Sequence, residues 1–448
     1  MDRWITDWVP SARWPHYTRA NAGEVLPPPA SPLGQQFSWE HGMILGWRDG
    51  YVRSGNYTAD EMDPNLPEAV GFFGGYFYIN LSNVRMQGVR SPAVTVEQLD
   101  MAFFGGHPDV PPYVAHPDDH QPELIDKALA HLGWMMTATS FPEIDDEREA
   151  TIAFRAERPD LATLTDVELL ARARSTQPMM RKLFESHALT SSASGVAPGI
   201  LFAIGEAIGD PTIPMKIVAG RGDVDSAEPS YALWDMSRLV RQHPELMEAF
   251  DAGVPGLIER LAASPSPATR LLLEEGRKFL TNFGSRGPNE YEMSADTWET
   301  KPEIALAALD RIRFQDDSES IRARNVKQAD ESDRAIATTR AKLGELGNPE
   351  LTGNFEAALV AGNQLSFRER TKTNLVRVIH EGRMAFRELG RRHHLAGSLG
   401  APEHVWMLLD EEVEGFVADP TSFTDTLAGR YVDWQALDEL EQIGRAHV

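Results

Sequence analysis

Apolar positions recur with a helical period along most of the chain. The stretch 122–136 shows this pattern and begins with Pro122, a residue favoured in the first turn of a helix. Farther along, Thr165 and Glu168 have the spacing of a helix N-cap and its capping-box partner. The pattern therefore predicts a mainly α protein, with a large helical body over residues 119–448.

The N-terminal part has a different pattern. Residues 1–35 are rich in Trp, Tyr and Pro, and the prolines of "LPPPASPLG" (26–34) exclude a long helix, so we expect an extended arm anchored by its aromatic side chains. In 69–86, a Gly-Gly pair between aromatic and β-branched residues predicts a hairpin with a strand at 76–81. We assign residues 36–118 to a small α/β portion.

Composition narrows the classes of function. The 43 Lys and Arg against 67 Asp and Glu give a net charge of −24, so we expect neither nucleic acid nor a membrane surface as a partner. There is no Cys, which excludes disulfides and thiolate chemistry. No apolar run of about 18 residues or secretory leader is evident, which predicts a cytoplasmic protein.

Two polar loops suggest ligands but lack the required spacing. "GRGDVDS" has neither the P-loop spacing nor the late Glu that a calcium loop starting at Asp223 or Asp225 needs, so a capping loop is favoured. His107, His116 and His120 lie among acids and prolines, without the spacing of a helical metal site. We expect no metal on this chain.

Positive charge is concentrated in "SFRERTKTNLVRVIHEGR" (366–383). A helix beginning near Phe367 places Arg368 and Lys372 one turn apart, with Glu369 about 100° round the axis. Cations at a helix N-terminus are unfavourable unless an anion comes there, and together with the helix dipole they form a phosphoryl receptor. Surface salt bridges to nearby acids are the alternative, and both stay open.

The loop "NFGSRGPNEYEM" contains a second polar pair. Gly284 and Gly287 permit backbone conformations that other residues avoid. Arg286 and Glu290 are spaced either to brace two parts of the protein against each other or to orient a polar ligand.

Several stretches together resemble a known family. "WPHYTRANAGEVLPPPASPLGQ", "GGYFYINLSNV", "AGRGDVDSAEPSYALWDMSRLV", "NFGSRGPNEYEMSADTW", "FRERTK" and "GRRHHLAGSLGAPEHVWMLLDEE" are similar, in order, to the middle domain of phosphoenolpyruvate-synthase-like dikinases, notably the rifampicin phosphotransferases. The resemblance spans about residues 14–440. It implies a largely helical domain that holds an acceptor substrate.

In that family the β-phosphoryl of ATP passes to the acceptor through a phosphohistidine, leaving AMP and phosphate. The resemblance implies that this chain is the acceptor-binding subunit, binds no cofactor itself, and works with a partner chain that supplies the ATP-grasp and phosphohistidine domains with ATP and Mg. We expect neither module ahead of Trp14 or after Val448. The expected acceptor is a small hydroxylated organic molecule, a phenol of aromatic compound catabolism being one candidate. The alternative is a non-catalytic binding or regulatory protein that retains the fold.

The resemblance also assigns catalytic residues. Arg368, Glu369 and Lys372 match the helix motif that faces the incoming phosphohistidine, and Gln35 or Gln36 falls where the family has a polar residue at the same centre. We expect Arg368, Lys372 and one of the two glutamines to be catalytic, with Arg368 and Lys372 stabilising the charge of the moving phosphoryl group.

The remaining matches imply substrate binding. Arg286 and Glu290 match the family's Arg-Gly-x-x-Glu loop, and together with Glu369 they are expected to contact the acceptor. Ser285 replaces the His that many relatives have before this Arg, which weakens a proton-transfer role at that position.

Overall fold

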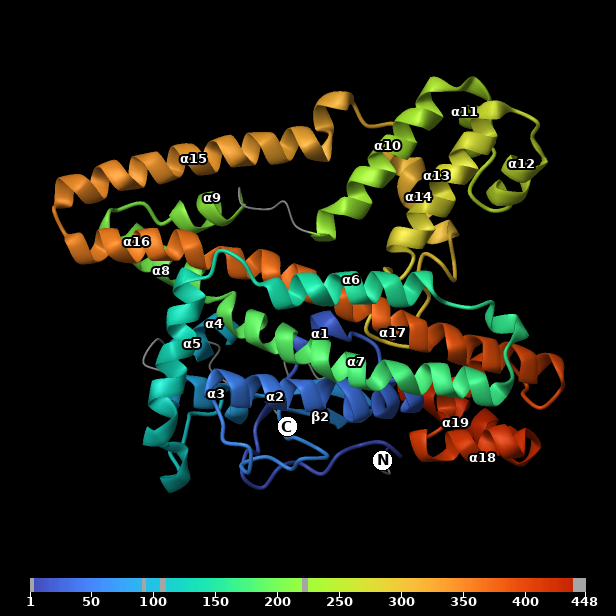
Figure 1. Cartoon of the computed structure of the whole chain (residues 1–448), viewed down its shortest axis with the longest axis horizontal. Coiled ribbons are helices and arrows are strands. Elements are labelled where there is room, and N and C mark those ends of the chain that lie inside the picture. The colour runs from blue at the N-terminus through green and yellow to red at the C-terminus, as the bar shows by residue number, and fades with distance from the viewer. Residues whose placement is uncertain (1–3, 91–93, 105–109, 220–224, 438–448) are drawn as a thin grey trace.

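Helices dominate the protein (Figure 1). The computed structural model describes residues 4–90, 94–104, 110–219 and 225–437, and 71% helix against 3% strand confirms the predicted mainly α class. The helices are α1 (Ala22–Val25), the π-helical η1 (Gly34–Met43), α2 (Ile44–Ser54), α3 (Leu81–Arg90), α4 (Val96–Phe104), α5 (Ile125–Thr137), α6 (Pro142–Ala156), α7 (Asp166–Ala193), α8 (Val196–Ala207), α9 (Ile213–Ala219), α10 (Glu228–Gln242), α11 (Pro244–Asp251), α12 (Leu257–Ala263), α13 (Pro267–Phe283), α14 (Glu303–Ile312), α15 (Ile321–Leu346), α16 (Pro349–Ala361), α17 (Asn363–Leu395), α18 (Val413–Ala418) and α19 (Thr424–Leu437). The strands are β1 (Tyr17–Thr18), β2 (Val70–Phe73) and β3 (Tyr76–Asn80).

Two long helices, α7 and α17, form the centre of the body and pack side by side (Figure 1). The predicted capping box starts α7: the Thr165 hydroxyl accepts from the Glu168 backbone N–H at 3.2 Å, and the Thr165 N–H donates to the Glu168 carboxylate at 2.8 Å. Helix α17 is buried along most of its 33 residues and also packs on α6. These two helices set the positions of the side chains discussed below.

The start of α17 differs from the prediction. The helix begins at Asn363, directly after Gly362 and the end of α16, and not near Phe367. No residue between Asn363 and Phe367 disfavours a helix strongly, so the tight junction with α16 sets the first turn. Arg368 and Lys372 therefore lie more than one turn inside the helix, and the argument from its N-terminal dipole was wrong.

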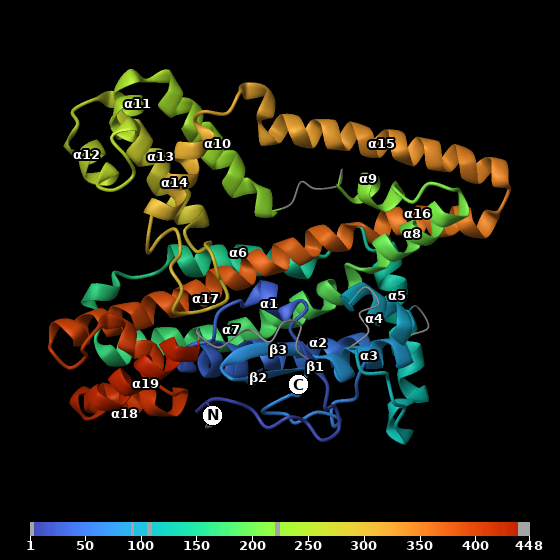
Figure 2. The same ribbon diagram turned by 180° about the vertical axis from the view of Figure 1, so that it is seen from behind.

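The predicted hairpin is confirmed, with its strand ending one residue earlier, at Asn80. Strands β2 and β3 are joined by Gly74 and Gly75, whose φ angles of 58° and 75° suit a tight turn that favours glycine. Strand β1 pairs antiparallel with the other edge of β3, giving the order β1-β3-β2 (Figure 2). The sheet therefore holds the N-terminal arm against the body.

Aromatic side chains anchor the arm as expected. Trp4, Trp8, Trp14 and Tyr17 are all buried, and the Trp8 indole N–H donates to the carboxylate of Glu40 at 2.7 Å. The main hydrophobic core contains residues from the arm, the sheet, α7, α17 and the C-terminal helices. It thus draws on all three predicted portions, whose boundaries at 35/36 and 118/119 stay a prediction.

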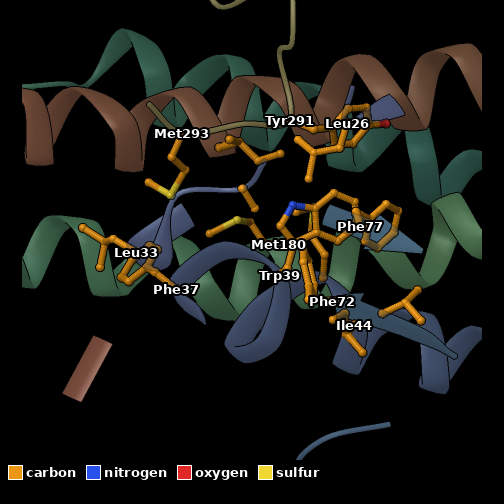
Figure 3. Close-up of a cluster of buried hydrophobic side chains, with 14 of the residues drawn as sticks. Leu26, Leu33, Phe37, Trp39, Ile44, Phe72, Phe77, Met180, Tyr291 and Met293 are labelled. Atoms are coloured by element: carbon orange, nitrogen blue, oxygen red, sulfur yellow. The ribbon is translucent and has the colours of Figure 1, made fainter. Parts of the chain in front are cut away.

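Figure 3 shows the centre of this core. Trp39, on η1, lies beside Phe77 and Tyr291, with ring centroids 4.4 Å and 5.9 Å away respectively. The π-helical pattern is visible at the end of η1, where the N–H of Ile44 donates to the carbonyl of Trp39, five residues earlier. This core forms one wall of the cavity described below.

Two further clusters lie outside the body. Helices α10–α14 surround their own apolar cluster and form an outer lobe (Figure 1). Helices α8, α9, α15 and α16 surround a second apolar cluster. The charged helix α15 also contacts α10, and so connects this cluster to the outer lobe. By length and composition alone the stretch Asp166–Ala207 could cross a membrane, but α7 packs in the core.

Candidate functional site

A cavity of about 660 Å³ lies where the arm, the sheet, α7 and α17 meet. One part of its wall is aromatic and is formed by Trp39, Trp47, Tyr51, Phe77, Phe103 and Phe184. The other part is polar and is formed by His187, Ser191, Asn289, Glu290, Arg368 and Lys372. Its volume and its division into an apolar and a polar part suit a small organic molecule with one polar group.

Helix α17 supplies the two cations. Arg368 and Lys372 are one turn apart and both line the cavity. Arg368 is 3.3 Å from the carboxylate of Glu369, and the ammonium of Lys372 is 3.0 Å from that of Glu290. The neighbouring Arg370 instead pairs with Asp145 and Asp225. All three cations of this stretch therefore form ion pairs, and Arg368 and Lys372 in addition line the cavity, so both interpretations stay open for these two residues.

The 285–290 loop carries the acidic partner. Glu290 bridges two cations, accepting from Arg286 Nε at 2.6 Å through one oxygen and lying 3.0 Å from Lys372 Nζ through the other. Asn289 has a φ of 56°, a left-handed conformation that Asn tolerates better than most residues. Arg286 does not line the cavity and pairs with Glu290 of its own loop, while Glu290 and Asn289 reach the cavity wall.

Gln35 and Gln36 are placed elsewhere. Gln35 is fully buried, and its amide donates to the Thr6 carbonyl at 2.5 Å and to Glu40 at 2.8 Å. Gln36 accepts from the backbone N–H of Asp410 at 2.9 Å. Neither lines the cavity, so the expectation that they join Arg368 there is not met: η1 turns Trp39, and not the glutamines, to the cavity.

The cavity also contains a histidine that the sequence had not singled out. His187, on α7, is 3.0 Å from the hydroxyl of Thr371 through Nδ1 and 3.4 Å from that of Ser191 through Nε2. Burial, reinforced by the charges of Arg368 and Lys372, lowers the pKa of His187 to about 3, so the ring is neutral. The only hint in the sequence is a His and a Ser four residues apart on one helical face.

The other polar loops have ordinary partners where the structure describes them. Asp225 pairs with Arg148 and Arg370, and His116 accepts from the backbone N–H of Asp118. Asp223 and His107 lie outside the described residues. Among the described residues, no group of three His, Asp or Glu side chains could hold a metal ion.

Comparison with known proteins places part of this geometry in a family. Residues 185–361 match the family model of the rifampicin phosphotransferase fourth domain, which confirms the expected resemblance. The matched segment includes His187 and Glu290 and ends seven residues before Arg368. Residues 185–361 are therefore similar to a domain of a phosphotransferase family.

Uncharacterized proteins of Mycobacterium tuberculosis and Mycobacterium bovis are also similar. Each is 29% identical over 170 residues, which cover 36% of this chain and 17% of the relative. The similarity thus spans about a sixth of the relatives' own length.

Proposed function

We propose that this chain holds the acceptor substrate of an ATP-dependent dikinase. The observation that supports it is that an aromatic wall and the cations of Arg368 and Lys372 line one and the same cavity. A phenol suits this arrangement because its ring would lie against the aromatic wall and its hydroxyl at the polar end. In this proposal a partner chain with ATP-grasp and phosphohistidine domains delivers the phosphoryl group.

Arg368 and Lys372 act on the phosphoryl group in flight. Transfer from phosphohistidine passes through a loose transition state whose negative charge is spread over the phosphoryl oxygens. Two fixed cations beside that position stabilise this charge more than they stabilise a neutral hydroxyl. Glu290 holds Lys372, and Arg286 holds Glu290, so the ammonium is positioned before the phosphoryl arrives.

A reconstituted transfer reaction tests the proposal. This chain is mixed with phenol, ATP, Mg²⁺ and a chain carrying the ATP-grasp and phosphohistidine domains, and phenyl phosphate and AMP are measured by ³¹P NMR and chromatography. We expect both products in equal amounts, and no phenyl phosphate when either chain is omitted. The chain alone should neither hydrolyse ATP nor bind it in a calorimeter.

The non-catalytic alternative has one observation in its favour. Each cavity cation already has an acidic neighbour, which is also what an inactive scaffold would retain. Phenols that bind in the cavity without any transfer, in a mixture whose partner chain is demonstrably phosphorylated on its histidine, would support this alternative.

A further inference from the structure

We propose that His187 is the group that takes the proton from the acceptor's hydroxyl, through its Nε2 atom. This inference rests on the proposed function and adds the base that the reaction needs. His187 lines the same cavity as Arg368 and Lys372, and it comes from the neighbouring helix, α7. A hydroxyl at the polar end would thus have the base and the cations in the same part of the cavity.

Hydrogen bonds around His187 favour one tautomer. The Thr371 hydroxyl donates to the carbonyl of Arg368 at 2.9 Å, and the Thr190 hydroxyl donates to the carbonyl of Ser186 at 3.0 Å. In this arrangement, in which the two threonine hydroxyls also lie 3.2 Å apart, Thr371 accepts from His187 at 3.0 Å. The proton of His187 therefore lies on Nδ1, and Nε2 keeps its lone pair.

Among the residues that the structure describes, the Nε2 lone pair has one long hydrogen-bond contact. Its neighbour, the Ser191 hydroxyl, is 3.4 Å away, and Ser191 also lines the cavity. Thr371 and Thr190 are both fully buried, so the hydrogen bonds that orient the ring are shielded from water. They make Thr371 a positioning residue, while Nε2 is the atom that would contact the acceptor.

The proton balance of the step is simple. The oxygen of the acceptor forms a bond to phosphorus as the P–N bond of the phosphohistidine breaks, and the electron pair of that bond stays on the partner's imidazole. The hydroxyl proton moves to Nε2 of His187 and is afterwards released to water. His187 is held neutral mainly by burial, and Arg368 and Lys372 reinforce this effect. Because the arriving phosphoryl group is negative, it offsets these two cations and so makes the ring a better base at the moment of transfer.

Titratable groups from several elements line the same cavity, and of these Arg368 and Lys372 act on the pKa of His187. The groups are Arg368 and Lys372 of α17, Glu290 and Tyr291 of the loop before α14, Glu24 of α1 and Tyr51 of α2. Burial raises the pKa of Tyr51 to about 12 and also raises that of Tyr291, so both phenols stay protonated at neutral pH. They are poor competitors for the proton.

The tautomer can be tested on this chain alone, independently of any partner. In ¹⁵N NMR spectra of the histidine-labelled protein, assigned with His187→Asn, we expect the His187 signals of a neutral ring protonated on Nδ1. Added phenol should shift the Nε2 signal. A proton on Nε2 overturns the proposal, because that atom then has no lone pair to accept another, whatever the outcome of the transfer assay.

The second test uses acceptors of different acidity. In the reconstituted reaction His187→Asn should lower the transfer rate to phenol by about 10²-fold, the usual effect of removing a general base. Transfer to 4-nitrophenol, which is largely ionised at slightly alkaline pH, should fall much less, because no proton has to be removed. Thr371→Val should reduce transfer to phenol to a smaller extent, by loosening the ring.

His131→Asn is the matched control, since this histidine stacks on Trp134 of α5 outside the cavity. It should transfer at the parental rate. The role of His187 is overturned if His187→Asn transfers to phenol at the parental rate, or if its transfer rates to phenol and to 4-nitrophenol fall by the same factor. Either result leaves the proposed function intact. Absence of transfer by the parent protein contradicts the proposed function instead.

Discussion

Lys372 is nine residues into α17, and its charge is balanced by Glu290 rather than exposed to the helix dipole. The side chain of Glu290 is only 9% exposed, so its carboxylate depends on both Lys372 and Arg286. Lys372 therefore has two roles. It stabilises the buried carboxylate of Glu290 in the resting protein, and in the proposed reaction it stabilises the phosphoryl group.

Replacing Lys372 with Met tests both roles. Because Glu290 loses one of its two cations, we expect the free energy of unfolding to fall by about 1 kcal/mol, and not to rise as a dipole argument would predict. The transfer rate should fall by about 10²–10³-fold, with phenol binding little changed. Urea unfolding, calorimetry and the transfer assay measure the three effects.

Lys278→Met serves as the control for that variant. Lys278 is an exposed lysine on α13 that pairs with Glu274 and Glu275. Its replacement should leave transfer at the parental rate. If Lys372→Met also transfers at that rate, the cation has no part in the chemistry.

At the scale of single elements, local signals were readable from the sequence. The capping box at Thr165 and the Gly-Gly turn between β2 and β3 depend on residues within a few positions of each other. The start of α17 was not predictable, because it depends on how tightly α16 ends before it. Side-chain partners were least predictable, since Lys372 meets Glu290 across 82 residues of chain.

The cap of α7 gives a prediction at this scale. Thr165→Ala removes a hydroxyl that satisfies the Glu168 N–H at the start of a central helix. We expect the free energy of unfolding to fall by about 1 kcal/mol, with phenol binding unchanged, because Thr165 lies at the end of α7 opposite to the cavity residues His187 and Ser191.

Thr338→Ala is the control for the cap. Thr338 is an exposed residue inside α15, and its hydroxyl donates to the carbonyl of Arg334, four residues earlier. Since Ala favours a helix interior more than Thr does, this variant should be no less stable than the parent. Equal losses in both threonine variants, measured by chemical denaturation, would contradict the capping role.

At the scale of the whole molecule, an ionic network connects the outer lobe to the body. Glu299, in the loop between α13 and α14, accepts from Arg155 of α6 at 2.5 Å and lies 2.9 Å from Nε2 of His380 on α17. Arg155 also pairs with Glu381, the next residue of α17. Nothing in the local sequence around these residues indicated their pairing, because three separate elements bring them together.

His380 makes this network sensitive to acid. Its Nδ1 accepts from Arg383 at 3.1 Å, so the proton of the neutral ring lies on Nε2 and is donated to Glu299. Burial lowers the pKa of His380 to about 3, against an ordinary value near 6.5. His187 and His131 have pKa values lowered to about 3 and about 4, in both cases mainly by burial.

The sign of the pH dependence follows from these values. In the unfolded chain the three histidines bind protons as the pH falls through about 6.5, whereas in the folded protein they stay neutral until about pH 4 or lower. Their stabilising effect is therefore complete above pH 7, and the free energy of unfolding decreases on acidification, by up to about 1.4 kcal/mol per pH unit for each histidine. Urea titrations between pH 7 and pH 4.5 measure this slope.

His380→Gln should be less stable than the parent at pH 7, and its slope should be smaller by the amount that one histidine contributes. His120→Gln, at an exposed position, should keep the whole slope of the parent. An unchanged slope in His380→Gln would mean that His380 has the same pKa in the folded and the unfolded protein, which would contradict the buried neutral ring that donates to Glu299.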